Sequence, residues 1–130
     1  MHRPTAYAGS LFTVVYAVCA DRSSPGAQFY RTELDDLERA KMNTLFKYIG
    51  DHGRITNQEK FRKLQGELWE FKSHQVRMPC YYLPGRLLVI THGFRKKGNS
   101  TPPEEIARAG RIRQEDGAVF REGRPIKWRN

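Results

Sequence analysis

The sequence has few cysteines and no long apolar run. Its 130 residues include two cysteines, Cys19 and Cys80, which lie far apart in strand-like apolar stretches and fit no metal-ligand spacing. We therefore expect two buried thiols instead of a disulfide. No apolar stretch approaches the ~18–20 residues that span a bilayer, and little charge precedes the short apolar run at 11–20. These features predict a reduced, cytoplasmic protein without a membrane segment.

Several common catalytic patterns are also missing. The chain has no Ser-His-Asp order, no glycine-rich phosphate loop, and no His/Cys/Asp cluster with metal-ligand spacing. The acidic residues lie mainly in the first turns of predicted helices, where the helix dipole already favours anions. We therefore assign them no chemistry and expect neither a metal site nor a cofactor.

Basic residues are abundant, and they are unevenly distributed. Residues 1–59 hold seven Lys/Arg and seven Asp/Glu, whereas residues 60–130 hold sixteen and seven, so the net charge of +9 arises in the second half. One interpretation is an ordinary solvated basic surface. The other is a binding face for phosphate backbones, because sequence-independent affinity for nucleic acid comes largely from such charge.

The length predicts one domain with a single hydrophobic core, and periodicity predicts its elements. We expect a loose leader at 1–10, a domain at 11–115 and a basic extension at 116–130, with a short strand at 118–121. The predicted order is a strand at 11–20, helices at 32–49 and 56–66, strands at 68–73, 76–83 and 87–91, and a helix at 102–115. This is an α+β fold, β-α-α-β-β-β-α, with an antiparallel meander packed on the N-terminal helices.

Capping patterns suggest where the helices begin. Thr32 is the expected cap of the first helix, and Thr56–Glu59 has the capping-box pattern of a second. Thr101 is the expected cap of the last, with Pro102 at the first helical position and Glu104 completing a box.

The first predicted helix has an apolar stripe that contains one lysine. The stripe consists of Leu34, Leu37, Lys41, Leu45 and Tyr48. In the meander, Pro79 cannot donate to a strand ladder, so we expect a bulge there or an N–H position that faces no neighbouring strand.

Strand alternation sorts the residues of the meander into two faces. If the larger apolar face meets the helices, Lys72, Arg77 and Tyr81 emerge together on the other face, with Lys96 from the adjacent strand. This arrangement suits RNA phosphates. The alternative is a solvated sheet face on which Glu70 pairs with Lys72 or Arg77.

His92 follows the last strand of the meander, and its position is ambiguous. Its parity matches that of Leu88, Ile90 and Phe94, which predicts a core histidine. Strand ends also twist or bulge out of phase, which would leave the ring outside the core.

Several short motifs occur in an order that resembles a known toxin superfamily. They are Lys63-Leu64, Leu68-Trp-Glu-Phe-Lys72, Arg77, His92-Gly-Phe-Arg-Lys-Lys97 and Thr101-Pro102. Together they resemble the RelE/ParE superfamily, most closely its phage-derived HigB-like branch, over about residues 11–115. Three departures are visible: Lys72 replaces an arginine, His74-Gln75 replaces an aromatic residue, and Pro79-Cys80 interrupts an aliphatic-aromatic strand.

The resemblance implies a small RelE-like fold and a function. Such proteins are toxins of type II toxin–antitoxin systems, and act as ribosome-dependent, metal-independent mRNA endoribonucleases through attack of the ribose 2′-hydroxyl on the adjacent phosphate. The implied partners are mRNA on the ribosome and a cognate antitoxin, encoded adjacently and carrying a helix-turn-helix domain. Two alternatives stay open: a ParE-like toxin that poisons DNA gyrase, and a phage-derived nucleic-acid-binding protein without activity.

Matching positions and local charge together give the candidate site residues. The catalytic candidates are Lys72, Arg77, His92 and Lys96. The RNA-binding candidates are Lys60, Arg62, Lys63, Tyr81, Arg95 and Lys97.

Overall fold

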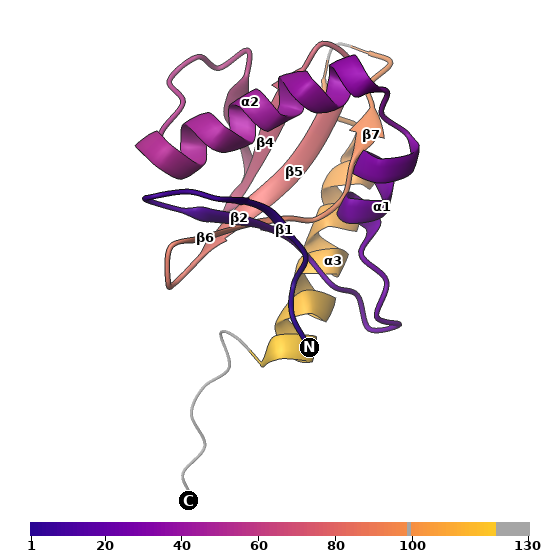
Figure 1. The fold of residues 1–130 in the computed structure, drawn as a ribbon. Coiled ribbons are helices and arrows are strands. Elements are labelled where there is room, and N and C mark those ends of the chain that lie inside the picture. The colour runs from indigo at the N-terminus through magenta and orange to yellow at the C-terminus, as the bar shows by residue number, and fades with distance from the viewer. Residues whose placement is uncertain (99, 122–130) are drawn as a thin grey trace, which may run out of the picture.

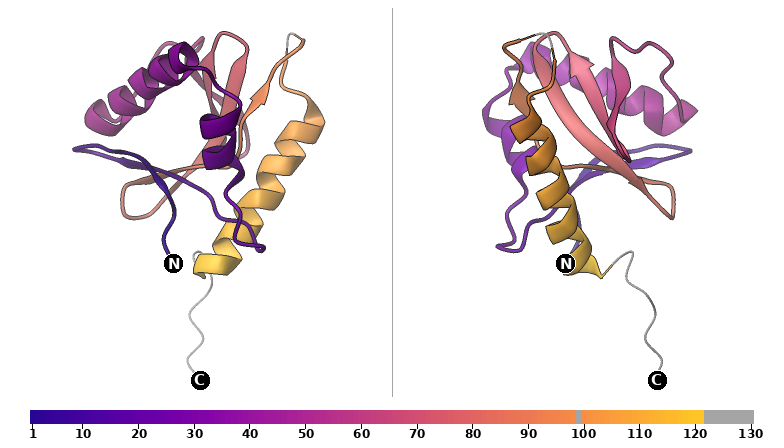
Figure 2. Two further views of the ribbon diagram at one scale, coloured as in Figure 1. Left: turned by 45° about the vertical axis from the view of Figure 1, so that its right-hand side comes forward. Right: turned by 180° about the vertical axis from the view of Figure 1, so that it is seen from behind.

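The computed structural model describes residues 1–98 and 100–121, and this part of the chain forms three layers. A mixed sheet has α1 and α2 on one face and α3 on the other (Figure 1; Figure 2). Its seven strands are β1 (Thr5–Ala8), β2 (Thr13–Tyr16), β3 (Phe61–Gln65), β4 (Leu68–Ser73), β5 (Val76–Leu83), β6 (Leu87–Ile90) and β7 (Phe94–Arg95). The helices in this part are α1 (Pro25–Thr32), α2 (Asp36–His52) and α3 (Pro103–Phe120). The predicted α+β class is confirmed.

The centre of the sheet is the meander predicted from the sequence. The strand order is β1-β2-β6-β5-β4-β3, and β7 pairs with the far end of β5. Strands β4, β5 and β6 are antiparallel neighbours, whereas β2 runs parallel to β6. A parallel pair needs a long crossover, and the helices, β3 and the meander together supply it.

Both edge strands differ from the prediction. Residues 1–10 contribute β1, which pairs with β2. Gly9, just after β1, lies so close to α2 that a Cβ there would be 2.2 Å from the Gly50 carbonyl carbon. Residues 56–66 do not form a helix, because Phe61 pairs with Phe71 in the β3–β4 hairpin. In each case pairing with the next strand along the chain decides a segment whose local pattern is weak or helical.

The N-terminal helices begin elsewhere than predicted. The segment containing Pro25 forms α1, and α2 starts after Asp35, which makes a reciprocal capping box with Glu38. The buried face of α2 is also rotated, since Leu37 is 64% exposed while Met42 and Phe46 are fully buried. Phe46 is large and packs edge-on against Phe71 of the sheet, so this side of the helix faces the core.

The start and end of α3 also correct the prediction. Thr101 is not its cap: the N-cap is Pro102, and the buried Thr101 hydroxyl donates to Glu70 Oε1 at 2.8 Å. The helix continues to Phe120, so the strand predicted at 118–121 is wrong. Residues 122–130 of the predicted extension lie outside the described residues.

Each face of the sheet has its own apolar cluster. Under α1 and α2 lie residues such as Phe46, Phe71 and Met78, while Ala109 and Ile112 of α3 cover the opposite face. That second face was expected to be open, which is wrong because α3 packs along it. The prediction of two buried free thiols, Cys19 and Cys80, is confirmed.

Pro79 lies in β5 without a bulge. It pairs with Glu70 in a continuous register with β4. On its other side β6 has ended at Ile90 and β7 has not begun, and the Pro79 carbonyl accepts from the Thr91 N–H at 2.9 Å. Proline is tolerated where the neighbouring ladder is interrupted.

Candidate functional site

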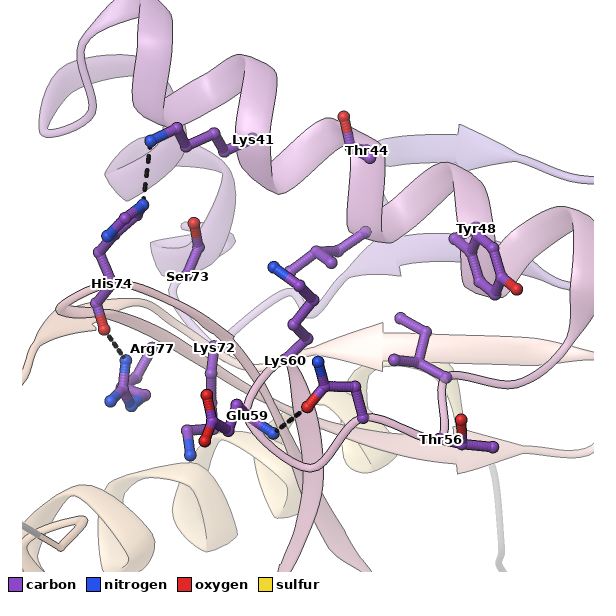
Figure 3. A pocket seen from close by; sticks show the side chains of 13 residues that line it. Lys41, Thr44, Tyr48, Thr56, Glu59, Lys60, Lys72, Ser73, His74 and Arg77 are labelled. Carbon is purple, nitrogen blue, oxygen red and sulfur yellow. Dashed lines mark hydrogen bonds between the residues drawn. The ribbon is translucent and has the colours of Figure 1, made fainter.

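A cleft of about 870 Å³ lies between α2, the segment 55–60 and the β4–β5 hairpin. Figure 3 shows its side chains, with those of α2 above and those of the hairpin below. We call it the cationic cleft, after five of its lining residues: Lys41, Lys60, Lys72, His74 and Arg77. Lys60, Lys72 and Arg77 belong to the predicted site, so the fold brings three of those candidates together.

Lys72 and Arg77 are direct cross-strand neighbours near the tip of the hairpin. Lys72 pairs with Arg77 in register. The next pair towards the tip is Ser73 with Val76, and a two-residue turn then joins the strands. In Figure 3 both side chains extend to the side of the hairpin away from α2. Burial, followed by the charges of Arg62 and Arg77, lowers the pKa of Lys72 below its usual value. Two cations are thus held side by side in a setting that disfavours their charge.

Arg77 is one of the residues that line the cleft, although its guanidinium lies on the side of the hairpin away from α2 (Figure 3). The residue is 5% exposed, and its Nη1 donates to the carbonyl oxygens of His74 and Val76. Its Nε is buried and has no hydrogen-bond partner among the described residues. Burial lowers the pKa of Arg77, against the opposing effect of Glu70. A buried donor without a partner is uncommon in folded proteins, and a charged guanidinium makes its strongest hydrogen bonds to anions.

His74 and Lys41 extend the site onto the tip of the hairpin and α2. His74 begins the hairpin turn with φ of 55°, and its Nε2 lies 2.9 Å from the Lys41 ammonium (Figure 3). Neither residue was among the sequence-based candidates. Lys41 had one signal, as the single charged member of an otherwise apolar helical stripe, whereas His74 had none beyond its place in a turn.

Three other predicted cations surround the hairpin with different degrees of exposure. Lys60 is exposed in the cleft, and Lys97 is exposed after β7. Lys96 adjoins the turn, since its backbone N–H donates to the Gln75 carbonyl at 2.7 Å, and its charge contributes to the lowered pKa of Lys72.

Two predicted RNA-binding arginines are engaged in ion pairs. Arg95 Nη2 donates to Glu38 Oε1 at 2.9 Å and to the Glu33 carbonyl at 2.7 Å, linking β7 to the start of α2. The hydrogen bond from Arg95, followed by that from the Asp35 backbone N–H, lowers the pKa of Glu38 to about 2. Arg62 Nε donates to the fully buried Glu70 at 3.2 Å. Both guanidiniums therefore have structural partners.

His92 is fully buried, which confirms the prediction of a core histidine, but not on the face that its parity indicated. It faces α3, because β6 ends at Ile90 and strand alternation does not continue through residues 91–93. Burial, opposed by Glu105, lowers the pKa of His92 to about 4, so the ring is neutral at pH 7. Its Nε2–H then donates to Glu105 Oε1 at 2.9 Å, and Nδ1 accepts from the Thr91 hydroxyl at 2.9 Å. Both ring nitrogens are occupied away from the cleft.

Tyr81 and Lys63 also lie away from the hairpin tip. Tyr81 is 1% exposed beneath α3, where its hydroxyl donates to the buried Asp116 at 3.0 Å. It does not emerge beside Lys72, so that placement is wrong. Lys63 lies on β3 with its ammonium 5.8 Å from the centre of the Trp69 ring.

Comparison with known families identifies the chain from its central segment. Residues 31–114, more than half of the sequence, match the family described as phage derived protein Gp49-like (DUF891). The chain belongs to the Gp49-like family. This is a RelE/HigB-like toxin family, in agreement with the resemblance seen in the sequence motifs. Comparison with curated proteins gives no significant match.

The matched segment of this Gp49-like protein contains α2, β3 to β7 and all five residues that define the cationic cleft. Within residues 1–98 and 100–121, no group of three or more His, Cys, Asp or Glu side chains could hold a metal ion. None of the described helices is both long and apolar enough to cross a membrane.

Proposed function

We propose that this Gp49-like protein is the toxin of a type II toxin–antitoxin pair and cleaves mRNA on the ribosome, in the cytoplasm, without a metal cofactor. The observation that supports this best is the paired placement of Lys72 and Arg77 at the hairpin tip, with a buried and unpartnered Arg77 Nε. A phosphate group would supply the missing acceptor and would neutralise two adjacent like charges.

The reaction that fits these groups is an internal transesterification. The ribose 2′-oxygen bonds to the adjacent phosphorus, the bond to the 5′-oxygen of the next nucleotide breaks, and a 2′,3′-cyclic phosphate and a 5′-hydroxyl result. Negative charge grows on the phosphate oxygens in the transition state. Arg77 and Lys72 would stabilise that charge, and preorganised donors of this kind are often worth about 3–4 kcal/mol each.

The proton taken from the 2′-hydroxyl needs an acceptor near the cleft. We assign this role to His74 in place of the buried His92, because His74 lines the cleft at the tip of the same hairpin. A phosphate that attracts the Lys41 ammonium would free His74 Nε2 to accept the proton. Lys96, adjoining the turn, stays the candidate donor to the leaving 5′-oxygen.

A cleavage assay on programmed ribosomes tests the proposal. Arg77→Ala should lower cleavage of a defined mRNA by about 10²-fold or more, and Arg77→Lys should recover part of this, because an ammonium cannot reproduce two fixed donors. Since Arg77 also holds the His74 carbonyl, the folded fraction of each variant is measured by circular dichroism. Arg31→Ala, an exposed arginine on α1, is the matched control.

Two outcomes would contradict the mechanism: wild-type rates for Arg77→Ala, or a requirement for added divalent metal once the ribosomes are kept assembled. Loss of plasmid supercoiling with intact mRNA would instead favour a gyrase-poisoning toxin. Intact mRNA and intact supercoiling would leave a nucleic-acid-binding protein without activity.

The proposal also implies an antitoxin that masks the basic surface. We expect a stable complex with an acidic or amphipathic segment of a neighbouring gene product, which carries a helix-turn-helix domain. Co-expression and pull-down check this. A protein that is harmless when expressed alone and retains no neighbouring product would not be a toxin of this type.

A further inference from the structure

A second hollow of about 500 Å³ lies beside the cationic cleft, on the other side of the segment that follows α2. We call it the aromatic hollow, after five of its lining residues: Arg54, Phe61, Lys63, Trp69 and Tyr82. Nothing in the proposed cleavage chemistry uses these side chains.

The rings of the hollow form a corner. Trp69 lies parallel to Phe61, with ring centres 5.3 Å apart and an angle of 7°, and meets Tyr82 nearly at a right angle, at 6.2 Å and 82°. Phe61 is buried, whereas Trp69 and Tyr82 are only partly buried. A planar group lying flat on one of these two partly exposed rings would face the edge of the other, which is a favourable geometry for aromatic contacts.

The charged groups at this corner are cations. Arg54 and Lys63 are exposed, and Arg62 reaches the hollow from β3 although its guanidinium pairs with Glu70. No aspartate or glutamate is among the described residues that line it. Aromatic rings flanked by exposed cations are the combination that binds single-stranded nucleic acid, in which bases stack and the backbone follows the positive charge.

The hollow also adjoins the cleft. Ile55 and Thr56 line both, so only this short segment separates the aromatic rings from the cations of the hairpin. A strand whose phosphate occupies the cleft can therefore cross this segment and place a nearby base against Trp69.

We infer that the aromatic hollow is a nucleobase subsite for single-stranded RNA, in which a base close to the cleaved phosphate stacks on Trp69 beside Tyr82 while Arg54 and Lys63 contact the backbone. The choice of RNA as the ligand rests on the proposed function. The subsite explains how the cationic cleft could favour an unpaired strand over a duplex, because only an unpaired base can turn out to stack.

The test uses the full chain with Trp128→Phe, which leaves Trp69 as its one tryptophan. The probe is a 2′-O-methyl hexanucleotide, which keeps bases and phosphates but has no 2′-hydroxyl to attack, and its partner is the same oligomer made abasic. We expect the base-containing oligomer to quench Trp69 emission and to bind about tenfold more tightly or better.

Variants then separate the two contributions. Trp69→Leu should abolish the advantage of the base-containing oligomer, whereas Arg54→Gln should weaken both oligomers and flatten their salt dependence. Arg31→Gln, an exposed position on α1, should change neither. Because Trp69→Leu disturbs packing against Phe61, the comparison of the two oligomers on the protein that retains Trp69 is decisive by itself.

The outcomes distinguish this inference from the proposed function. Equal affinity for the two oligomers without a change in Trp69 emission overturns the subsite, even if mRNA is cleaved. Base-dependent quenching by a protein that cleaves no mRNA supports the subsite and overturns the proposed function. Absence of binding by both oligomers overturns the subsite as well.

Discussion

Lys72 and Arg77 face each other across the β4–β5 hairpin as an in-register pair of like charges. Such pairs oppose folding, and burial adds to the effect by disfavouring both charges. Glu70 lies close enough to stabilise the charge of Arg77, but its carboxylate already accepts hydrogen bonds from Arg62 and Thr101. The free protein therefore keeps an arrangement that an anion would relieve.

Replacing one member of this pair should separate stability from activity. Lys72→Gln removes the like-charge contact, so we expect the free energy of unfolding to rise by about 0.5 kcal/mol while cleavage falls. Urea unfolding and the ribosome assay measure the two effects. A variant that is markedly less stable than wild type would show that Lys72 has a structural role that outweighs the repulsion.

His74 can be replaced without disturbing its turn. His74→Asn should fold normally, because asparagine tolerates the left-handed conformation that φ of 55° requires, but cleavage should fall by about 10²-fold. His2→Asn, at an exposed position near the N-terminus, is the control. Unchanged cleavage by His74→Asn would remove His74 from the mechanism and return proton transfer to Lys96.

The ion pairs separate the candidate RNA contacts into two groups. Lys60→Ala should reduce the slope of log affinity against log salt by about 0.7 for each lost phosphate contact, as for single-stranded nucleic acid. Arg95→Ala should leave that slope unchanged and lower stability instead, because Arg95 joins β7 to Glu38 of α2. Equal slope changes in both variants would mean that Arg95 leaves Glu38 when RNA binds.

The buried His92 makes the free energy of unfolding depend on pH. Folding lowers the pKa of His92 from 6.5 to about 4. As the pH falls, this histidine is therefore protonated in the unfolded chain before it is protonated in the folded protein. The contribution of His92 is complete above about pH 6.5 and is lost as the pH falls towards 4. Unfolding measured at several pH values should show this slope, and His92→Gln should remove it. The imidazole NMR signals should titrate near pH 4; a midpoint near 6.5 would contradict the burial argument.

The meander was predictable because its signals are local. Alternating side chains in β4 and β5 define two faces, and the turn at His74-Gln75 fixes their register, which placed Lys72 beside Arg77. The edge strands were not predictable in this way. Thr56–Glu59 carries a capping pattern, yet pairing of Phe61 with Phe71 makes the next residues a strand.

The features of the candidate site were likewise predictable only in part. The net positive charge of the second half of the chain and the Lys72–Arg77 pair followed from residue order and strand parity, whereas His92 is buried because α3 packs over it. Tertiary structure alone decided which candidate side chains remain available: Glu38 binds Arg95, Glu70 binds Arg62, and α3 covers Tyr81. The physical reason is that a side chain's charge is written in the sequence, whereas its partner is set by strand pairing, as for Arg62 and Glu70, or by the packing of remote elements, as for Arg95 and Glu38.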